Sequence, residues 1–178
     1  MIRTSITILV SVLGFALASC GSQSIRPLDS ESSGAIIGNL KVPSGYRYIN
    51  LNKIGEVYVA PFKSPPQAFT DANGNFIFEN LSPGQYYLLN VSDGHQVYAI
   101  ATSEAEVKKN LIEVKAGQIV FIGSLVFTNI KKPLLATSTF EITRVNTPDE
   151  KTIIKELIPP ARNTGWDTRL EAKLRTLK

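Results

Sequence analysis

Apolar and polar positions alternate in short runs along most of this 178-residue chain. From Ala35 onward, Gly, Pro or Asn interrupts these runs about every 8 to 12 residues, a spacing typical of antiparallel β-sandwiches and barrels. The pattern therefore predicts a mainly β domain, an antiparallel sandwich of about seven to nine strands. The expected strands are Ala35–Leu40, Tyr46–Asn50, Glu56–Pro61, Asn75–Glu79, Gln85–Val91, Val97–Ala101, Asn110–Val114, Ile119–Thr128 and Thr139–Val145.

The hydrophobic period lengthens after Asn146 and predicts two short C-terminal α-helices. Thr147 can cap the first helix, Pro148 suits its first turn, and Glu150 is placed for a capping box. Apolar residues then follow at helical spacing until Pro159-Pro160, and a second helix is expected after Thr164. The two apolar faces comprise Ile153, Ile154, Leu157 and Ile158, and Trp166, Leu170, Leu174 and Leu177. They pack on the sandwich or on each other, or they dock a partner from an exposed tail.

The N-terminus combines Arg3 with an apolar stretch, Ile6 to Leu17, that is too short for a permanent transmembrane helix. The Leu17-Ala18-Ser19-Cys20 sequence that follows resembles the lipobox of bacterial lipoproteins. The resemblance implies cleavage before Cys20 and lipidation of its thiol, which would anchor the protein to a membrane. The alternative is an ordinary signal peptide in which the cysteine lies there by chance. Gly21, where an Asp would retain many lipoproteins in the inner membrane, favours the outer membrane in a Gram-negative host.

The chain is expected to divide into four segments: a signal peptide at 1–19, a flexible tether at 20–33, the sandwich at 34–145 and a helical extension at 146–178. The tether is polar and has too few apolar groups to offset the entropy of ordering. With Cys20 as the one cysteine, the sandwich must form without disulfides. The net charge is only +4, and the sequence has no dense run of Lys and Arg, so no nucleic-acid partner is expected.

The densest local motif runs from Asp71 to Leu88 and reads as a turn, a strand, a second turn and another strand. The Asp71 side chain can accept backbone N–H groups, and Gly74 can take the positive φ that closes the first turn. Phe76 and Phe78 then point to one face of the strand, opposite Ile77, and are the better core candidates.

The second half of the motif reverses the chain at Pro83-Gly84, after Leu81 enters the core. Tyr86 follows this turn. It can bury its ring and return its hydroxyl to the backbone near the bend, as in the tyrosine corner of Greek-key sandwiches. Tyr86 is therefore expected to be a structural residue rather than a ligand contact.

The combined pattern Asp-x-x-Gly-x-Phe-x-Phe-x-x-Leu-x-Pro-Gly-x-Tyr-x-Leu resembles the signature of carboxypeptidase regulatory-like domains. The tight match covers Asp71 to Leu88, and a looser one extends from Gly34 to Phe127. The resemblance implies a Greek-key, prealbumin-like (transthyretin-like) sandwich. Such domains serve as accessory modules for stability, spacing or binding, so the resemblance is specific for the fold and nearly silent on activity.

No catalytic, metal or cofactor site emerges from the residues. His95 is the only histidine, whereas the zinc site of metallocarboxypeptidases needs two, and Ser92 and Asp93 lie too close to it to form a triad. Asp71, Asn73 and Asn75 resemble a calcium loop faintly, but Ser82 stands where that loop needs Glu.

The sequence therefore predicts a membrane-anchored, non-enzymatic lipoprotein whose sandwich is a structural or protein-interaction module with an envelope protein as partner. The alternative is glycan or small-ligand binding through an aromatic face, which requires at least three exposed aromatics on one sheet. The candidates are Tyr46, Tyr48, Tyr58, Tyr87, Tyr98 and Trp166. A hydrolase is a distant third possibility.

Overall fold

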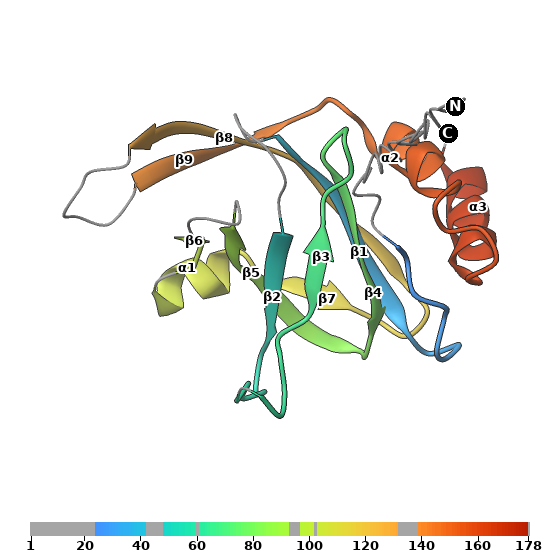
Figure 1. The fold of residues 1–178 in the computed structure, drawn as a ribbon, viewed down its shortest axis with the longest axis horizontal. Helices are drawn as coiled ribbons and strands as arrows, with labels where there is room; N and C mark the ends of the chain where they lie inside the picture. Colours follow the sequence, from blue (N-terminus) through green and yellow to red (C-terminus); the bar gives the residue numbers. More distant parts are fainter. Residues whose placement is uncertain are drawn as a thin grey trace, which may run out of the picture.

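Two β-sheets packed face to face, with helices against one outer face, make up the fold in the computed structural model (Figure 1). The structure describes residues 24–41, 48–59, 61–92, 97–101, 103–131 and 139–177. The predicted mainly β sandwich with C-terminal helices is confirmed. Its elements are β1 (Gly34–Lys41), β2 (Tyr48–Lys53), β3 (Gln67–Phe69), β4 (Asn75–Leu81), β5 (Gly84–Ser92), β6 (Val97–Ala99), α1 (Glu104–Lys109), β7 (Ile112–Val114), β8 (Ile119–Lys131), β9 (Thr139–Val145), α2 (Glu150–Leu157) and α3 (Trp166–Thr176).

The first sheet has the strand order β4-β1-β8-β9, and the second has the order β3-β2-β5-β6, with β7 also pairing with β5. Among the described strands, every pair is antiparallel except β1 with β8, in which Ala35 lies opposite Ile119 in parallel register. This parallel pair is the one departure from the antiparallel sandwich that the sequence predicts. It places β1 in the centre of its sheet.

Three short segments differ from the predicted elements. The expected strand Glu56–Pro61 is wrong, because its described residues are irregular and run into a turn at Pro61. The three-residue strand β3 and helix α1 were not predicted. The expected strand Asn110–Val114 is shortened to β7, because Asn110 forms the C-cap of α1.

Two hydrophobic cores lie on opposite faces of the first sheet, so β1 is buried on both sides. Ile36, Phe76 and Phe78 belong to the core between the two sheets, whereas Ile37 and Ile77 face the helices. Because strand side chains alternate between faces, one run of apolar residues supplies both cores. The expected separation of Phe76 and Phe78 from Ile77 is present, and all three are buried.

The C-terminal helices form the second core with the outer face of the first sheet. Trp166 and Leu170 of α3 and Ile153 of α2 are fully buried there, so the structure shows the packing alternative rather than an exposed docking tail. The start of α2 differs from the prediction. Its N-cap is Asp149, whose side chain accepts the Thr152 N–H at 2.8 Å, while Thr147-Pro148 is a cis peptide outside the helix.

Residues 24–33, the described part of the expected tether, lie against the domain. Arg26 Nε is 2.8 Å from Glu79 Oε1, and the Leu28 N–H donates to the Thr164 carbonyl at 2.7 Å. Arg169 donates to the carbonyls of Ser33 and Glu31. This part of the chain is therefore a packed segment, which corrects the expectation of a free tether there.

The expected signal peptide, Cys20 and Gly21 lie outside the described residues, as do Tyr46, Asp93 and His95. Within the described ranges, no helix is long and apolar enough to cross a membrane.

Candidate functional site

The Asp71 turn of the sequence motif is built by its own hydrogen bonds. Asp71 Oδ1 accepts the backbone N–H groups of Asn73 and Asn75, both at 2.8 Å, and Gly74 takes a φ of +86°. Asn75 is completely buried, and its side chain also donates to Asp71. The carboxylate is thus occupied by turn chemistry, and no cluster of three or more candidate metal ligands exists among the described residues.

The turn at Pro83-Gly84 is closed by Tyr86. Its ring is buried, and its hydroxyl donates to the Ser82 carbonyl at 2.6 Å. Leu81, just before this turn, is buried in the core between the sheets. The motif residues therefore stabilise the sandwich, and the side chains available for recognition must be sought elsewhere.

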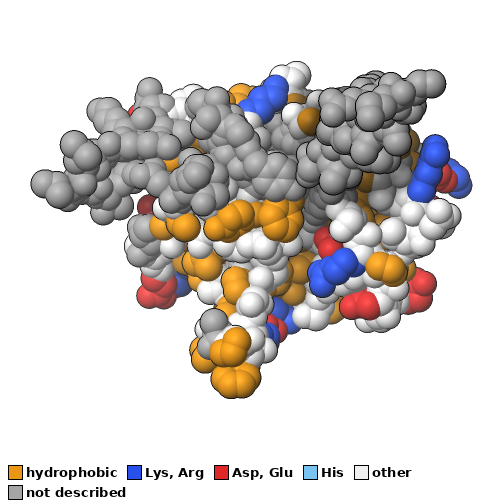
Figure 2. Space-filling view, in the orientation of Figure 1, with side chains coloured by type: hydrophobic (Ala, Val, Ile, Leu, Met, Phe, Trp, Pro, Cys, Tyr) orange, Lys and Arg blue, Asp and Glu red, His pale blue; other side chains and the backbone are white. Residues whose placement is uncertain are grey.

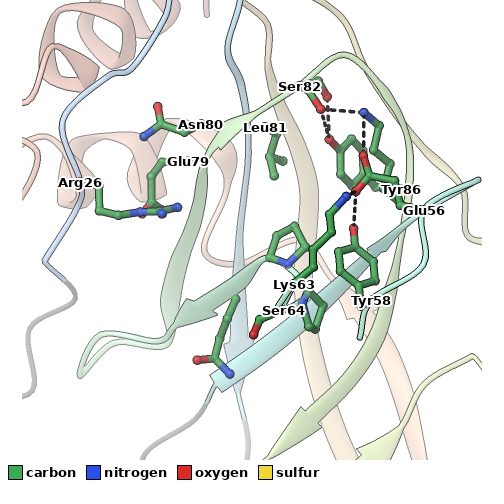
Figure 3. A pocket seen from close by; sticks show the side chains of 14 residues that line it. Arg26, Glu56, Tyr58, Lys63, Ser64, Glu79, Asn80, Leu81, Ser82 and Tyr86 are labelled. Carbon is green, nitrogen blue, oxygen red and sulfur yellow. Dashed lines mark hydrogen bonds and ion pairs between the residues drawn. The ribbon is translucent and has the colours of Figure 1, made fainter. Parts of the chain in front are cut away.

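A groove of about 420 Å³ lies beside this turn, where edge strand β4 of the first sheet approaches the loop between β2 and β3 (Figure 3). Glu56 is one of the lining residues: its carboxylate binds Lys63 Nζ at 2.7 Å and Lys53 Nζ at 3.5 Å, and accepts the Tyr58 hydroxyl at 3.2 Å. Lys53 Nζ also contacts Ser82 Oγ at 2.6 Å, and Lys63 lies over the Tyr58 ring. We call Lys53, Glu56, Tyr58 and Lys63 the loop brace.

The electrostatics of the loop brace are those of a satisfied ion-pair network. The hydrogen bond from Lys63 holds the pKa of Glu56 below its usual value, against the effect of desolvation. Burial, together with the charge of Glu56, raises the pKa of Tyr58 to about 12. A carboxylate kept ionised and a phenol kept neutral suit structural pairing better than proton transfer near pH 7. The other carboxylate of the groove, Glu79, is paired with Arg26.

The same β2–β3 loop also exposes a group of large apolar side chains. Phe62 is 89% exposed and Val57 77%, and Ile54 and Val59 are also exposed. Figure 2 shows this segment as an apolar projection from one end of the molecule. We call Ile54, Val57, Val59 and Phe62 the apolar loop. Contiguous exposed apolar groups with polar surroundings typically mark interaction sites.

The apolar loop was not predicted from the sequence, although the sequence contains a signal for it. Glu56, Val57, Tyr58 and Val59 alternate polar and apolar residues as a strand does, and this pattern led to the wrong strand. The Lys63-Ser64-Pro65-Pro66 run that follows restricts the backbone of the returning arm. The N–H groups of Phe62 and Lys63 both donate to the Val59 carbonyl, which folds the tip into a turn.

The aromatic face required for glycan binding does not form among the described residues. Trp166 is buried in the second core, and Tyr98 is buried on β6. Tyr48, Tyr58 and Tyr87 are half-buried. None of these five rings reaches full exposure, so the criterion of three exposed aromatics on one sheet is not met.

No protein-family model matches the chain, and no curated protein matches it. Among solved structures, a leucine-rich repeat protein from Bacteroides thetaiotaomicron aligns at 12% identity and a TM-score of 0.37, over 56% of this chain and 12% of that one. A DUF3823 family protein from Parabacteroides merdae aligns at 14% identity and a TM-score of 0.26, over 65% and 60%. The chain thus spans less than two thirds of either structure, and both superpositions are too loose to carry an argument about fold or function.

Proposed function

We propose that this protein is a lipid-anchored envelope protein whose β-sandwich is a non-catalytic interaction module. The observation that carries the proposal is the apolar loop, a projecting turn with four exposed apolar side chains on a base fixed by ion pairs. The site is suited to inserting Phe62 into an apolar pocket of an envelope protein. Large aromatic side chains of this kind dominate the free energy of many protein interfaces.

The anchor part of the proposal rests on the Leu17-Ala18-Ser19-Cys20 sequence and its likeness to a lipobox. With Gly21 after the cysteine, the outer membrane is the favoured address in a Gram-negative host. The likeness of Asp71–Leu88 to carboxypeptidase regulatory-like domains supports an accessory role rather than an enzymatic one.

A rigid loop favours a protein partner because rigidity lowers the entropic cost of forming a specific interface. The loop brace, the Val59 turn and Pro65-Pro66 all restrict the apolar loop before it meets a partner. Specific docking depends on such a defined shape, whereas partition into a lipid surface depends mainly on the apolar area buried.

The anchor is tested by Cys20→Ala in the native cell. The variant should move from the membrane fraction to the soluble fraction, and labelled palmitate should be incorporated by the wild-type chain only. A variant that stays in the membrane fraction and a wild-type chain without label would contradict the anchor.

The interaction site is tested by placing a photoreactive phenylalanine analogue at position 62 in intact cells. One discrete protein adduct should form there and should disappear when Val59→Asp is added in the same chain. The matched control is the analogue at Val97, which is 60% exposed and lies at the opposite end of β5 from the apolar loop. An adduct that forms equally at both positions, or lipid adducts alone, would refute the protein-docking site.

A further inference from the structure

A second cavity, of about 430 Å³, opens between the two sheets at the edge opposite the groove. It lies where α1 interrupts the edge of the second sheet: β6 pairs with the end of β5, β7 pairs with its beginning, and α1 fills the sequence between them (Figure 1). The interrupted edge leaves the interior of the sandwich accessible from this side.

Aliphatic side chains form part of the cavity wall and join it to the core between the sheets. Leu88 of β5, Ile112 of β7 and Ile122 of β8 line it and pack on that core while remaining only partly buried. Ile142 of β9 lies at its wall and is 36% exposed. A volume of this size, lined by aliphatic side chains from both sheets, is within the range of small-ligand sites.

The mouth of the cavity carries two cations. Phe140, Ile142 and Arg144 are every second residue of β9 and therefore lie on the same face of the strand. On this face, Phe140 stacks on Phe127 of the core. Arg144 and Lys109 of α1 both line the cavity, and neither makes an ion pair within the described part of the chain. The carboxylate at the mouth, Glu106, accepts the Ser103 N–H in the capping box of α1.

We propose that this cavity binds an amphiphile with a single alkyl chain and an anionic head group. The chain would lie along the aliphatic part of the wall, and the head group would pair with Arg144 and Lys109. Arginine is well suited to this role because its guanidinium can bind a carboxylate or phosphate through two parallel hydrogen bonds. The proposal is independent of the apolar loop, which lies at another edge of the sandwich.

An inward-pointing charge on an edge strand has another known use, since it discourages pairing with a second sheet. That role would account for Arg144 alone. It leaves unexplained the second cation from a different element and the aliphatic cavity beneath both. The two explanations differ in a direct measurement, because edge protection requires no ligand.

The test is calorimetric titration of the full-length chain carrying Cys20→Ala with dodecanoate or dodecyl phosphate, both below their micelle concentrations. Dodecyltrimethylammonium, which has the same chain and a cationic head, is the charge control. We expect both anions to bind and the cation to bind at least about tenfold more weakly, the scale of one charge-assisted hydrogen bond. A preference for one anion identifies the head group as carboxylate or phosphate.

Two variants locate the binding. Arg144→Glu should weaken binding of either anion about tenfold or more, and Ile142→Trp should abolish it by filling the cavity from its exposed wall. Arg162→Glu is the matched control: Arg162 is exposed, lies outside the cavity and should leave the affinity unchanged. Circular dichroism checks the fold of each variant. Absence of binding, equal binding of the cation, or binding unaffected by Arg144→Glu and Ile142→Trp would overturn the proposal.

Discussion

The Tyr86 hydroxyl donates a hydrogen bond of 2.6 Å to the Ser82 carbonyl, four residues earlier, and so ties the start of β5 to the turn that precedes it. The ring is buried in the core between the sheets, 2% exposed. Tyr86 thus links the core to the edge of the groove, because Ser82 also contacts Lys53 of the loop brace.

Tyr86→Phe should lower the free energy of unfolding by about 1–2 kcal/mol, because it leaves the Ser82 carbonyl without its donor while keeping the buried ring. Urea denaturation followed by far-UV circular dichroism measures the change. The control is Tyr48→Phe, since Tyr48 is half-buried on β2 and its hydroxyl makes no hydrogen bond within the described residues. Equal effects of the two substitutions would contradict the role of the Tyr86 hydroxyl.

Gly74→Ala should destabilise the protein more than Gly55→Ala, although the two glycines have similar φ angles of +86° and +82°. A Cβ at position 74 would lie 2.6 Å from the Leu40 carbonyl oxygen, whereas a Cβ at position 55 would meet no atom within 4 Å. Gly55→Ala should therefore show only the left-handed backbone cost of about 1–2 kcal/mol. Gly74→Ala adds displacement of β1, and thermal unfolding of the two variants separates the contributions.

Trp166→Ala should lower the free energy of unfolding by about 3–5 kcal/mol, because the side chain is fully buried in the second core. Leu177→Ala, at the partly buried end of the same apolar face, should cost clearly less. Chemical denaturation measures both. If the two variants had the same small effect, α3 would not be docked on the first sheet as described.

Tyr58 should ionise with a pKa of about 12, well above the ordinary value of 10. Because the unfolded state loses this proton first, Tyr58 contributes stability that is present below pH 10 and is lost between pH 10 and 12. The difference in absorbance at 295 nm between wild type and Tyr58→Phe isolates its titration. Glu56→Gln should lower the midpoint by removing the nearby charge, and should leave the contribution from burial.

Glu56 should act in the opposite direction at acid pH. Its hydrogen bond with Lys63 lowers the pKa in the folded state, so the stability it supplies is present above the unfolded pKa and is lost as the pH falls through the folded value. The loss of stability on acidification should therefore be smaller in Glu56→Gln than in wild type. Denaturation curves at neutral and acid pH, with Glu113→Gln as an exposed control, provide the comparison.

In the parts of the fold that the sequence predicts correctly, local chemistry and tertiary packing favour the same structure. The Asp71 turn, the alternation of Phe76, Ile77 and Phe78, and the Tyr86 contact all follow from residues within one short segment. The helical face that contains Trp166 and Leu170 was recognisable for the same reason, since its apolar spacing is also what packs.

The predictions fail where either the local sequence pattern or the tertiary packing is missing. Helix α1 buries none of its residues and has no apolar stripe, so the Ser103–Glu106 capping box is the one local signal that predicts it. The Glu56–Val59 run has the alternation of a strand but pairs with no other strand in the described part of the chain. The packing of residues 24–33 depends on Glu79 and Arg169, which are distant in sequence.

The groove and the cavity between the sheets were beyond sequence reasoning for a similar reason. Lys53, Glu56 and Lys63 meet only because the β2–β3 loop folds back on itself. Lys109 and Arg144 approach one cavity from two elements that are not paired with each other. Neither arrangement has a local motif, and both depend on how the edges of the sandwich are placed.

The packed segment at residues 24–33 gives the domain a defined mechanical coupling to whatever precedes it in the chain. Three contacts resist a pull applied before Ser24. Arg26 pairs with Glu79 of β4, the Leu28 N–H donates to the Thr164 carbonyl before α3, and Arg169 of α3 donates to the Ser33 carbonyl. The load is thus divided between the first sheet and the C-terminal helix before it reaches β1. β1 follows this segment directly and is held between β4 and β8.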